Sequence, residues 1–242
     1  MNKITVGIDI SLDSTGIVAT DGKRTEYVNL LNAYKITKDK KKLANLDLMV
    51  DDNEILKGLS KVKNYAQVFY SRKPSSVKGS DLQQWHRTHM DFCTEKSVKV
   101  CIALQGLLKK FNAESAAINI EYYSYGSISN GGSASVQIIE VTSAIKQRII
   151  LNSICTHEDM TVIPGPNIKK FAGGGNWQKF DLLQAYLELN LANDTFYEYI
   201  KKNFKDLYTV KVKGKGSITE NEVATPIDDI IDAFWICRYS AQ

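Results

Sequence analysis

The sequence predicts an α/β protein built on a mixed β-sheet. Residues 4–36 form three consecutive segments of strand-like alternation separated by short turns, the pattern of an antiparallel meander. From residue 96 onwards, segments with helical spacing of apolar residues alternate with further strand-like segments. A meander followed by alternating strands and helices is typical of a mixed sheet flanked by helices.

The meander begins with a strand at residues 4–10, ITVGIDI. Side chains alternate along a strand, so its apolar residues share one face. That face carries Ile4, Val6, Ile8 and Ile10, and the other carries Thr5, Gly7 and Asp9. A turn at 13–16 leads to a second strand, IVAT, and Asp21-Gly22 predicts a hairpin turn into a third strand within residues 24–36. The first three strands are therefore predicted to be antiparallel.

The remaining elements follow in order along the chain. They are a helix at 96–112, a strand at 116–123, a helix at 136–151, a short strand at 161–166, and helices at 177–191 and 226–240. The sheet thus has five predicted strands. We interpret residues 37–94, in which only a helix near 54–70 is expected, as an insertion or accessory subdomain within a single domain of 242 residues. Residues 203–224 are basic and predict an exposed hairpin insertion.

The composition is that of a soluble globular protein, with 43% hydrophobic and 24% charged residues and a net charge of +4. This charge permits a nucleic-acid partner without requiring one. The four cysteines lack metal-site spacing, so we expect reduced core thiols. No signal peptide and no membrane-spanning apolar run is visible. We therefore expect a cytoplasmic protein, inside a bacterium or a virus-infected host cell, with no membrane partner.

Acidic residues occupy matching positions on separate elements. Asp9 leaves its strand on the face opposite the isoleucines, and Glu121 has the same polar phase near the end of the fourth strand. The last helix adds Asp228, Asp229 and Asp232 at spacings that place them on one side. Clustered carboxylates raise one another's pKa unless cations neutralise them, and their oxygens suit Mg²⁺ or Mn²⁺. Asp228 also fits a helix-capping position after Thr225, so it is either a ligand or a cap.

The segments GIDIS, STG, IEYY and DDIIDAF resemble, in this order, the RuvC-type Holliday-junction resolvases of the RNase H-like superfamily, including their phage and viral branch. The resemblance implies an RNase H-like fold in which Asp9, Glu121, Asp229 and Asp232 bind two Mg²⁺ ions, with Mn²⁺ as a substitute. IKKFAGGGNWQK is similar to the family's lysine-containing segment. It implies that Lys169 and Lys179 lie near the scissile phosphate, with Lys179 taking part in catalysis.

The resemblance further implies a crossover junction endodeoxyribonuclease. Such a nuclease is a hydrolase of DNA recombination and repair that nicks branched DNA, above all four-way junctions, as a homodimer. Candidate DNA-binding residues surround the acidic positions. They are Lys169, Lys170 and Lys179 beside the glycine run, and Tyr122, Tyr123 and Tyr125 directly after Glu121. Residues 37–94 and 203–224 depart from the compact bacterial pattern of the family.

Two other functions remain open from the sequence. The piece GIDISLDSTG also resembles the phosphate-binding hairpin of actin- and hexokinase-type ATPases or kinases, where Asp9 would orient a metal-bound water. Those enzymes need two duplicated domains, and DDIIDA has no natural role in them. The third hypothesis is a catalytically silent protein that binds branched DNA. The complete set of acids argues against it.

Overall fold

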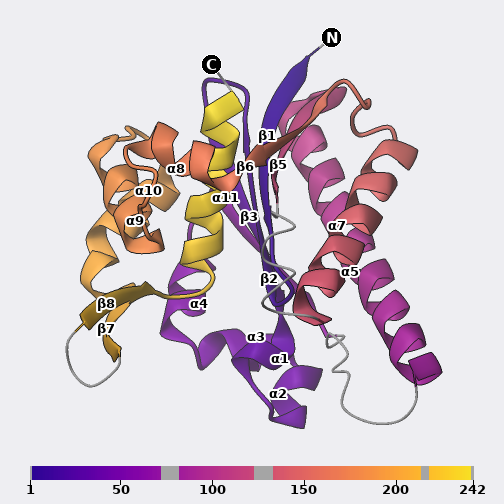
Figure 1. Cartoon of the computed structure of the whole chain (residues 1–242). Helices are drawn as coiled ribbons and strands as arrows, with labels where there is room; N and C mark the ends of the chain where they lie inside the picture. The colour runs from indigo at the N-terminus through magenta and orange to yellow at the C-terminus, as the bar shows by residue number, and fades with distance from the viewer. Residues whose placement is uncertain (1, 72–81, 123–132, 214–217, 241–242) are drawn as a thin grey trace.

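The computed structural model describes residues 2–71, 82–122, 133–213 and 218–240 (Figure 1). A six-stranded mixed sheet in the order β4-β3-β2-β1-β5-β6 forms its centre. Its strands are β1 (Lys3–Ile10), β2 (Ser14–Thr20), β3 (Thr25–Asn32), β4 (Tyr65–Tyr70), β5 (Ser115–Tyr122) and β6 (Met160–Pro164). The α/β class and the antiparallel pairing of the first three strands are confirmed, while the other pairings are parallel.

The first hairpins form where the sequence predicts them, with one shift. Gly22 adopts a φ of 84° in the β2–β3 turn, a conformation that glycine reaches without steric cost. Strand β2 begins at Ser14, earlier than expected, because the turn between β1 and β2 is short. The Ser11 amide donates to the Ser14 carbonyl at 3.1 Å, and the Ser11 hydroxyl accepts from the Ser14 amide at 3.0 Å.

The helix expected near residues 54–70 is only partly correct. Helix α4 (Glu54–Leu59) is followed by β4, which pairs in parallel with β3 and makes six strands out of the predicted five. The segment YAQVFY is rich in aromatic residues, which favour a strand. Part of 37–94 therefore belongs to the main sheet. The short helices α1 (Ala33–Ile36), α2 (Lys40–Ala44) and α3 (Leu46–Asp51) precede α4.

The second half alternates helices with the remaining strands. Its helices are α5 (Leu82–Phe111), α7 (Ser133–Leu151), α8 (Gly165–Ala172), α9 (Lys179–Glu188), α10 (Thr195–Asn203), a 3-10 turn (Phe204–Asp206) and α11 (Ile227–Ser240). Helix α5 begins well before residue 96, and α8 and α10 were not expected. The predicted basic hairpin is present as β7 (Tyr208–Lys213) and β8 (Ile218–Val223), a separate two-stranded sheet. No helix among the described residues could cross a bilayer.

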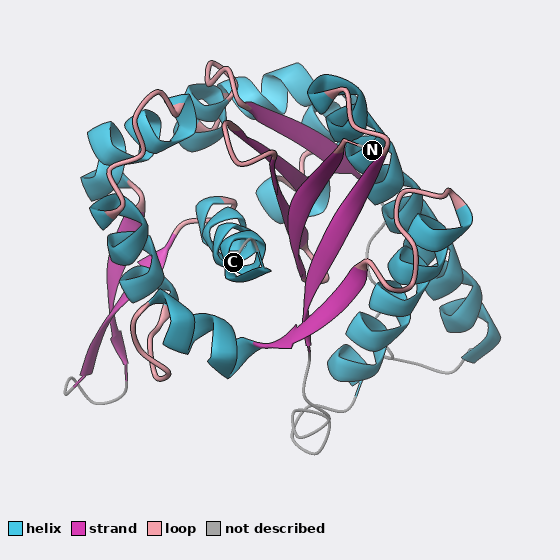
Figure 2. Ribbon diagram, turned by 90° about the horizontal axis from the view of Figure 1, so that it is seen from above, coloured by secondary structure: helices cyan, strands magenta, loops and turns pink. Residues whose placement is uncertain are grey.

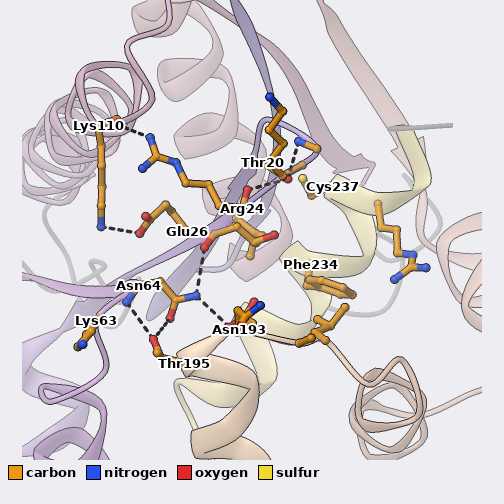
Figure 3. A pocket seen from close by; sticks show the side chains of 18 of the residues that line it. Thr20, Arg24, Glu26, Lys63, Asn64, Lys110, Asn193, Thr195, Phe234 and Cys237 are labelled. Carbon is orange, nitrogen blue, oxygen red and sulfur yellow. Dashed lines mark hydrogen bonds and ion pairs between the residues drawn. The ribbon is translucent and has the colours of Figure 1, made fainter.

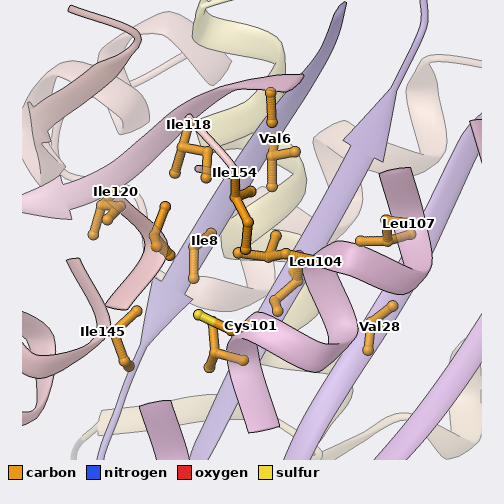
Figure 4. Packing of buried hydrophobic residues seen from close by; sticks show 14 of the residues in the cluster. Val6, Ile8, Val28, Cys101, Leu104, Leu107, Ile118, Ile120, Ile145 and Ile154 are labelled. Atoms are coloured by element: carbon orange, nitrogen blue, oxygen red, sulfur yellow. The ribbon is translucent and has the colours of Figure 1, made fainter. Parts of the chain in front are cut away.

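One face of the sheet packs against α5 and α7. Figure 4 shows Val6 and Ile8 of β1 and Ile118 and Ile120 of β5 in one buried cluster with Leu104 and Cys101 of α5. The isoleucine face of β1 is fully buried here, as its alternation predicts. All four cysteines are buried free thiols, in agreement with the expectation from their spacing. This layer is mainly apolar packing and leaves the polar face of β1 to the other side.

Helix α11 lies directly on that other face, across β1 and β2 (Figure 2). Two glycines make this close approach possible. A Cβ at Gly7 would lie 2.2 Å from the Ala233 carbonyl oxygen, and one at Gly16 would lie 2.1 Å from the Asp229 carbonyl oxygen. Helices α8, α9 and α10 pack around α11 in a second apolar cluster. The polar positions of β1 are consequently covered by the helix that carries the acidic residues.

Candidate active site

Strands β1 and β5 bring the first two acids together. Their parallel register ends with Ile8 opposite Ile120, so Asp9 and Glu121 are the next residues on neighbouring strands, which run about 5 Å apart. The Asp9 side chain is buried under α11. Glu121 lies against the first residue of α8, where a Cβ on Gly165 would come 2.2 Å from Glu121 Oε1. The absence of a side chain at Gly165 thus leaves space for this carboxylate.

The first turns of α11 supply the other acids. Because α11 contacts β2 at Gly16, Asp229 is pressed against the sheet and is only 4% exposed. The Ser14 hydroxyl donates to the Asp229 carboxylate and in turn accepts from the Asn29 amide at 3.0 Å. Asp229 is therefore held by a hydrogen-bonded pair of side chains from β2 and β3.

The capping position expected for Asp228 is not found. The helix begins at Ile227, and the amide of Ile230 donates to the carbonyl of Pro226, so Thr225 does not cap it. Asp228 instead directs one carboxylate oxygen toward Lys179. Its other oxygen, Oδ1, is buried and accepts no hydrogen bond from any described residue. Asp228 therefore belongs to the acidic cluster.

The acids interact as one electrostatic group. Burial raises the pKa of Asp9 well above its usual value, and Asp232 and Asp229 raise it further. Burial, followed by the charge of Asp232, raises the pKa of Glu121 to about 7. Burial and the neighbouring Asp228 likewise raise the pKa of Asp229 to about 7. Because each ionised carboxylate opposes the ionisation of the next, the full set requires a cation at neutral pH.

Lys179, the first residue of α9, supplies positive charge to this group. Its Nζ lies 2.8 Å from Asp228 Oδ2, 3.3 Å from Asp232 Oδ2 and 3.8 Å from Asp229 Oδ1. Partial burial alone would lower the pKa of Lys179, but Asp232 and the other two carboxylates outweigh it and raise the pKa above its usual value. The structure therefore brings Lys179 to the acids, while leaving its side chain half exposed.

The carboxylate oxygens of this cluster suit a hard divalent cation as ligands. In this structure they are arranged around an ammonium group. Among the described residues, no three His, Cys, Asp or Glu side chains converge closely enough to hold a metal ion as they stand. The Lys179 ammonium lies among three of the carboxylates, and the orphaned Asp228 Oδ1 is a further oxygen ready to bind a cation. Carboxylate oxygens are the ligands that Mg²⁺ prefers.

The structure places only some of the remaining candidate DNA-binding residues near the acids. Lys169 on α8 is close enough to lower the pKa of Glu121, and Lys170 on the same helix is exposed. Tyr122 ends β5, with only its backbone described, and Tyr123 and Tyr125 lie outside the described residues. The glycine run has a packing role, since Cβ atoms on its first two glycines would lie 2.1 and 2.3 Å from the indole of Trp177.

One buried cation near the acids, Lys96, was not predicted from the sequence. Lys96 of α5 is 0% exposed and reaches the turn between β1 and β2. Burial lowers its pKa to about 7, although the charges of Asp229, Asp13 and Asp9 act in the opposite direction. A sequence signal for this position existed, because Lys96 falls on the apolar stripe formed by Phe92 and Val100 at four-residue spacing.

A cavity of about 830 Å³ lies at the other end of α11, beside the β2–β3 hairpin (Figure 3). It contains none of the predicted site residues. Three of its charged groups already have partners, since Lys110 Nζ lies 2.5 Å from Glu26 Oε2 and the Asp194 carboxylate caps α10. The acidic cluster at the carboxyl end of β1 therefore remains the candidate active site.

The strand order agrees with the fold class expected from the sequence. The segment β3-β2-β1-β5-β6, antiparallel in its first three strands and crossed by α11, has the RNase H-like arrangement expected from the sequence, with β4 added at its edge. No family model and no curated protein sequence matches the chain.

Among solved structures, the crystal structure of the yeast mitochondrial Holliday junction resolvase Ydc2 aligns with 98% of this chain and 75% of that chain. The sequence identity is 10% and the TM-score is 0.36. A likeness at this level defines neither the fold nor the activity of this chain. The fold class follows from the strand order itself.

Proposed function

We propose that the protein is a metal-dependent endonuclease that nicks branched DNA, in the manner of the RuvC-type resolvases that its motifs resemble. One observation carries this proposal. Carboxylates from β1, β5 and α11 and a lysine from α9 lie close enough to shift one another's pKa, although these residues are up to 223 positions apart in the chain, as Asp9 and Asp232 are. Packing alone does not account for a buried cluster of like charges, whose ionisation is costly without a cation.

In this proposal Asp9, Glu121, Asp229 and Asp232 would hold two Mg²⁺ ions, for which Mn²⁺ substitutes. Two such ions activate a water molecule and stabilise the leaving oxygen in phosphodiester hydrolysis. Ser14 and Asn29 would keep the Asp229 carboxylate in place. Lys179, drawn to the acids in this structure, would contact the scissile phosphate as its side chain turns toward DNA.

DNA binding would use the cations of α8 and the aromatic segment after Glu121. Lys169 and Lys170 would contact backbone phosphates, whose charge dominates DNA affinity. Tyr122, Tyr123 and Tyr125 would stack on bases opened at the branch point. Two symmetric nicks across a four-way junction require two active sites, so a two-fold homodimer is the matching assembly. Such a nuclease would act inside the cell, in DNA recombination or repair.

The test is cleavage of labelled four-way junctions, flaps, forks and linear duplexes with Mg²⁺. Asp9→Asn should abolish nicking while leaving junction binding intact. Asp47→Asn provides a matched control, since Asp47 is an exposed acid of α3 outside the site. Both variants should melt cooperatively.

The possible outcomes separate the competing functions. Cleavage by Asp9→Asn at the wild-type rate would show that the metal site is misassigned. Equal cutting of linear and branched DNA would remove the structure selectivity. ATP hydrolysis without DNA cleavage would favour the ATPase or kinase alternative. Junction binding by the wild type without any nicking would favour a catalytically silent DNA-binding protein.

A further inference from the structure

Lys96 lies on the opposite side of the sheet from α11, yet its side chain ends close to the acidic residues. It projects from α5 and is completely buried. Its Nζ donates to the carbonyl oxygen of Ser11 and, at 3.1 Å, to that of Ser14. It also lies 3.4 Å from the Leu12 carbonyl oxygen and 3.3 Å from the Tyr70 hydroxyl. One ammonium group thus donates hydrogen bonds to several carbonyl oxygens of a single turn.

A lysine at this position carries a cost that an apolar residue would avoid. Transfer of an ammonium group out of water is unfavourable unless hydrogen bonds and charges compensate for it. The carbonyl groups of the turn provide that compensation, and the rings of Tyr70 and Phe92 lie 5.1 and 5.9 Å from the ammonium. Methionine would fill the same space between apolar neighbours without this requirement. The lysine is therefore better explained by its hydrogen bonds to the turn than by packing.

The turn that Lys96 holds leads directly to the candidate site. Ser11 follows Asp9 by two residues, at the end of β1. Ser14 contacts Lys96 through its carbonyl oxygen, while its hydroxyl donates to Asp229. The Tyr70 hydroxyl also stabilises the turn, because it donates a hydrogen bond to the Leu12 carbonyl oxygen at 2.7 Å. Two of the four proposed metal ligands, Asp9 and Asp229, therefore depend on the conformation of residues 11–14.

We propose that Lys96 is a positioning residue that fixes the 11–14 turn and, through it, the carboxylates of Asp9 and Asp229. This inference rests on the proposed function in that these carboxylates are taken as metal ligands. The hydrogen bonds of the Lys96 ammonium go to the turn backbone and the Tyr70 hydroxyl, and its effect on Asp229 passes through the turn and the Ser14 hydroxyl. Residues that orient metal ligands in this way typically change metal affinity or activity by about 10–100-fold when removed.

The test compares Lys96→Met with Lys99→Met, a control on the same helix whose lysine is only half buried. Hydrogen exchange of the Ser11 amide is measured first in the metal-free protein, because this amide donates to Ser14 within the turn. Mn²⁺ affinity is then measured by electron paramagnetic resonance, and junction affinity in Ca²⁺. Lys96→Met should lose protection at Ser11 and bind Mn²⁺ about 10–100-fold more weakly, with junction affinity unchanged. Lys99→Met should match the wild type.

Tyr70→Phe covers the case in which Lys96→Met does not fold. It keeps the lysine and removes one tie to the turn, so it should show the same changes to a smaller degree. Wild-type exchange and Mn²⁺ affinity in the folded variants would overturn the inference and leave the proposed nuclease intact. A wild type that binds no Mn²⁺ would instead overturn the proposed function, while exchange at Ser11 would still decide whether Lys96 holds the turn.

Discussion

Gly16 is the position where the fold and the candidate site depend on each other most directly. A Cβ at this position would lie 2.1 Å from the Asp229 carbonyl oxygen and 2.5 Å from its carbonyl carbon. Both atoms belong to the backbone of α11, so no side-chain rotation relieves the contact. In Gly16→Ala the helix must move away from β2 by at least about 1.3 Å to restore an ordinary van der Waals distance of 3.4 Å or more.

This displacement sets the expected magnitudes. Overpacking of this kind costs about 1–3 kcal/mol of unfolding free energy. The same movement carries Asp229 away from Asp9 and from the Ser14 hydroxyl. Since a misplacement of about 1 Å in a catalytic arrangement costs about 100-fold in rate, we expect a loss of nicking of that order. Mn²⁺ affinity should fall along with it.

The assay pairs urea unfolding with single-turnover junction cleavage. Gly106→Ala is the matched control, because a Cβ at Gly106 in α5 meets nothing within 4 Å. Alanine there should raise the unfolding free energy by about 0.5–1 kcal/mol through helix propensity and leave cleavage unchanged. A Gly16→Ala protein with the stability and Mn²⁺ affinity of the wild type would refute the close packing of α11 on β2 and the placement of Asp229 that follows from it.

Three further outcomes are expected. Lys179→Met removes the cation that lies among the acids, so single-turnover nicking at saturating Mg²⁺ should fall by about 100-fold, and a rate within twofold of the wild type would exclude a catalytic role. Burial and like charge raise the pKa of Glu121 and Asp229 to about 7, so the folded state binds more protons than the unfolded state between about pH 4 and 7. The unfolding free energy of the metal-free protein should therefore decrease as the pH rises through this range. Thermal melts should show stabilisation by Mg²⁺ at about pH 8 and little at about pH 5, and equal shifts at both values would contradict this. Gly165→Ala places a Cβ 2.2 Å from Glu121 Oε1 and should weaken Mn²⁺ binding with little change in melting temperature, because only a side chain has to move.

The parts of the fold with strong periodicity were predictable from the sequence. Alternation identified β1, and i, i+3, i+4 spacing identified α11. The face assigned to Asp9 was correct because a period of two leaves only two choices. Alternation also gave Glu121 the polar phase of Asp9, whereas the resemblance to the RuvC-type resolvases joined Asp229 and Asp232 to them; in the structure the charges of all three act on Asp9.

The missed elements were short or chemically ambiguous. The six residues of β4 also fit a helix, and only their pairing with β3 decides between the two. Helix α10 contains Phe196, Tyr197 and Ile200 among lysines and tyrosines, and its signal was the capping residue Asp194. Lys96 was missed because its burial depends on carbonyl groups from a turn 82 residues earlier in the chain, at Ser14.

The two-sided character of β1 also bears on how the chain folds. A slip of one residue in its pairing with β2 or β5 would exchange the faces of the strand. Asp9 would then enter the apolar layer beneath α5 and α7, and an isoleucine would take its place under α11. Both Gly7 and the carboxylate would be lost from the surface on which α11 docks. The carboxylate of Asp9 thus penalises misregistered pairings, and it helps to select the native register while the sheet assembles.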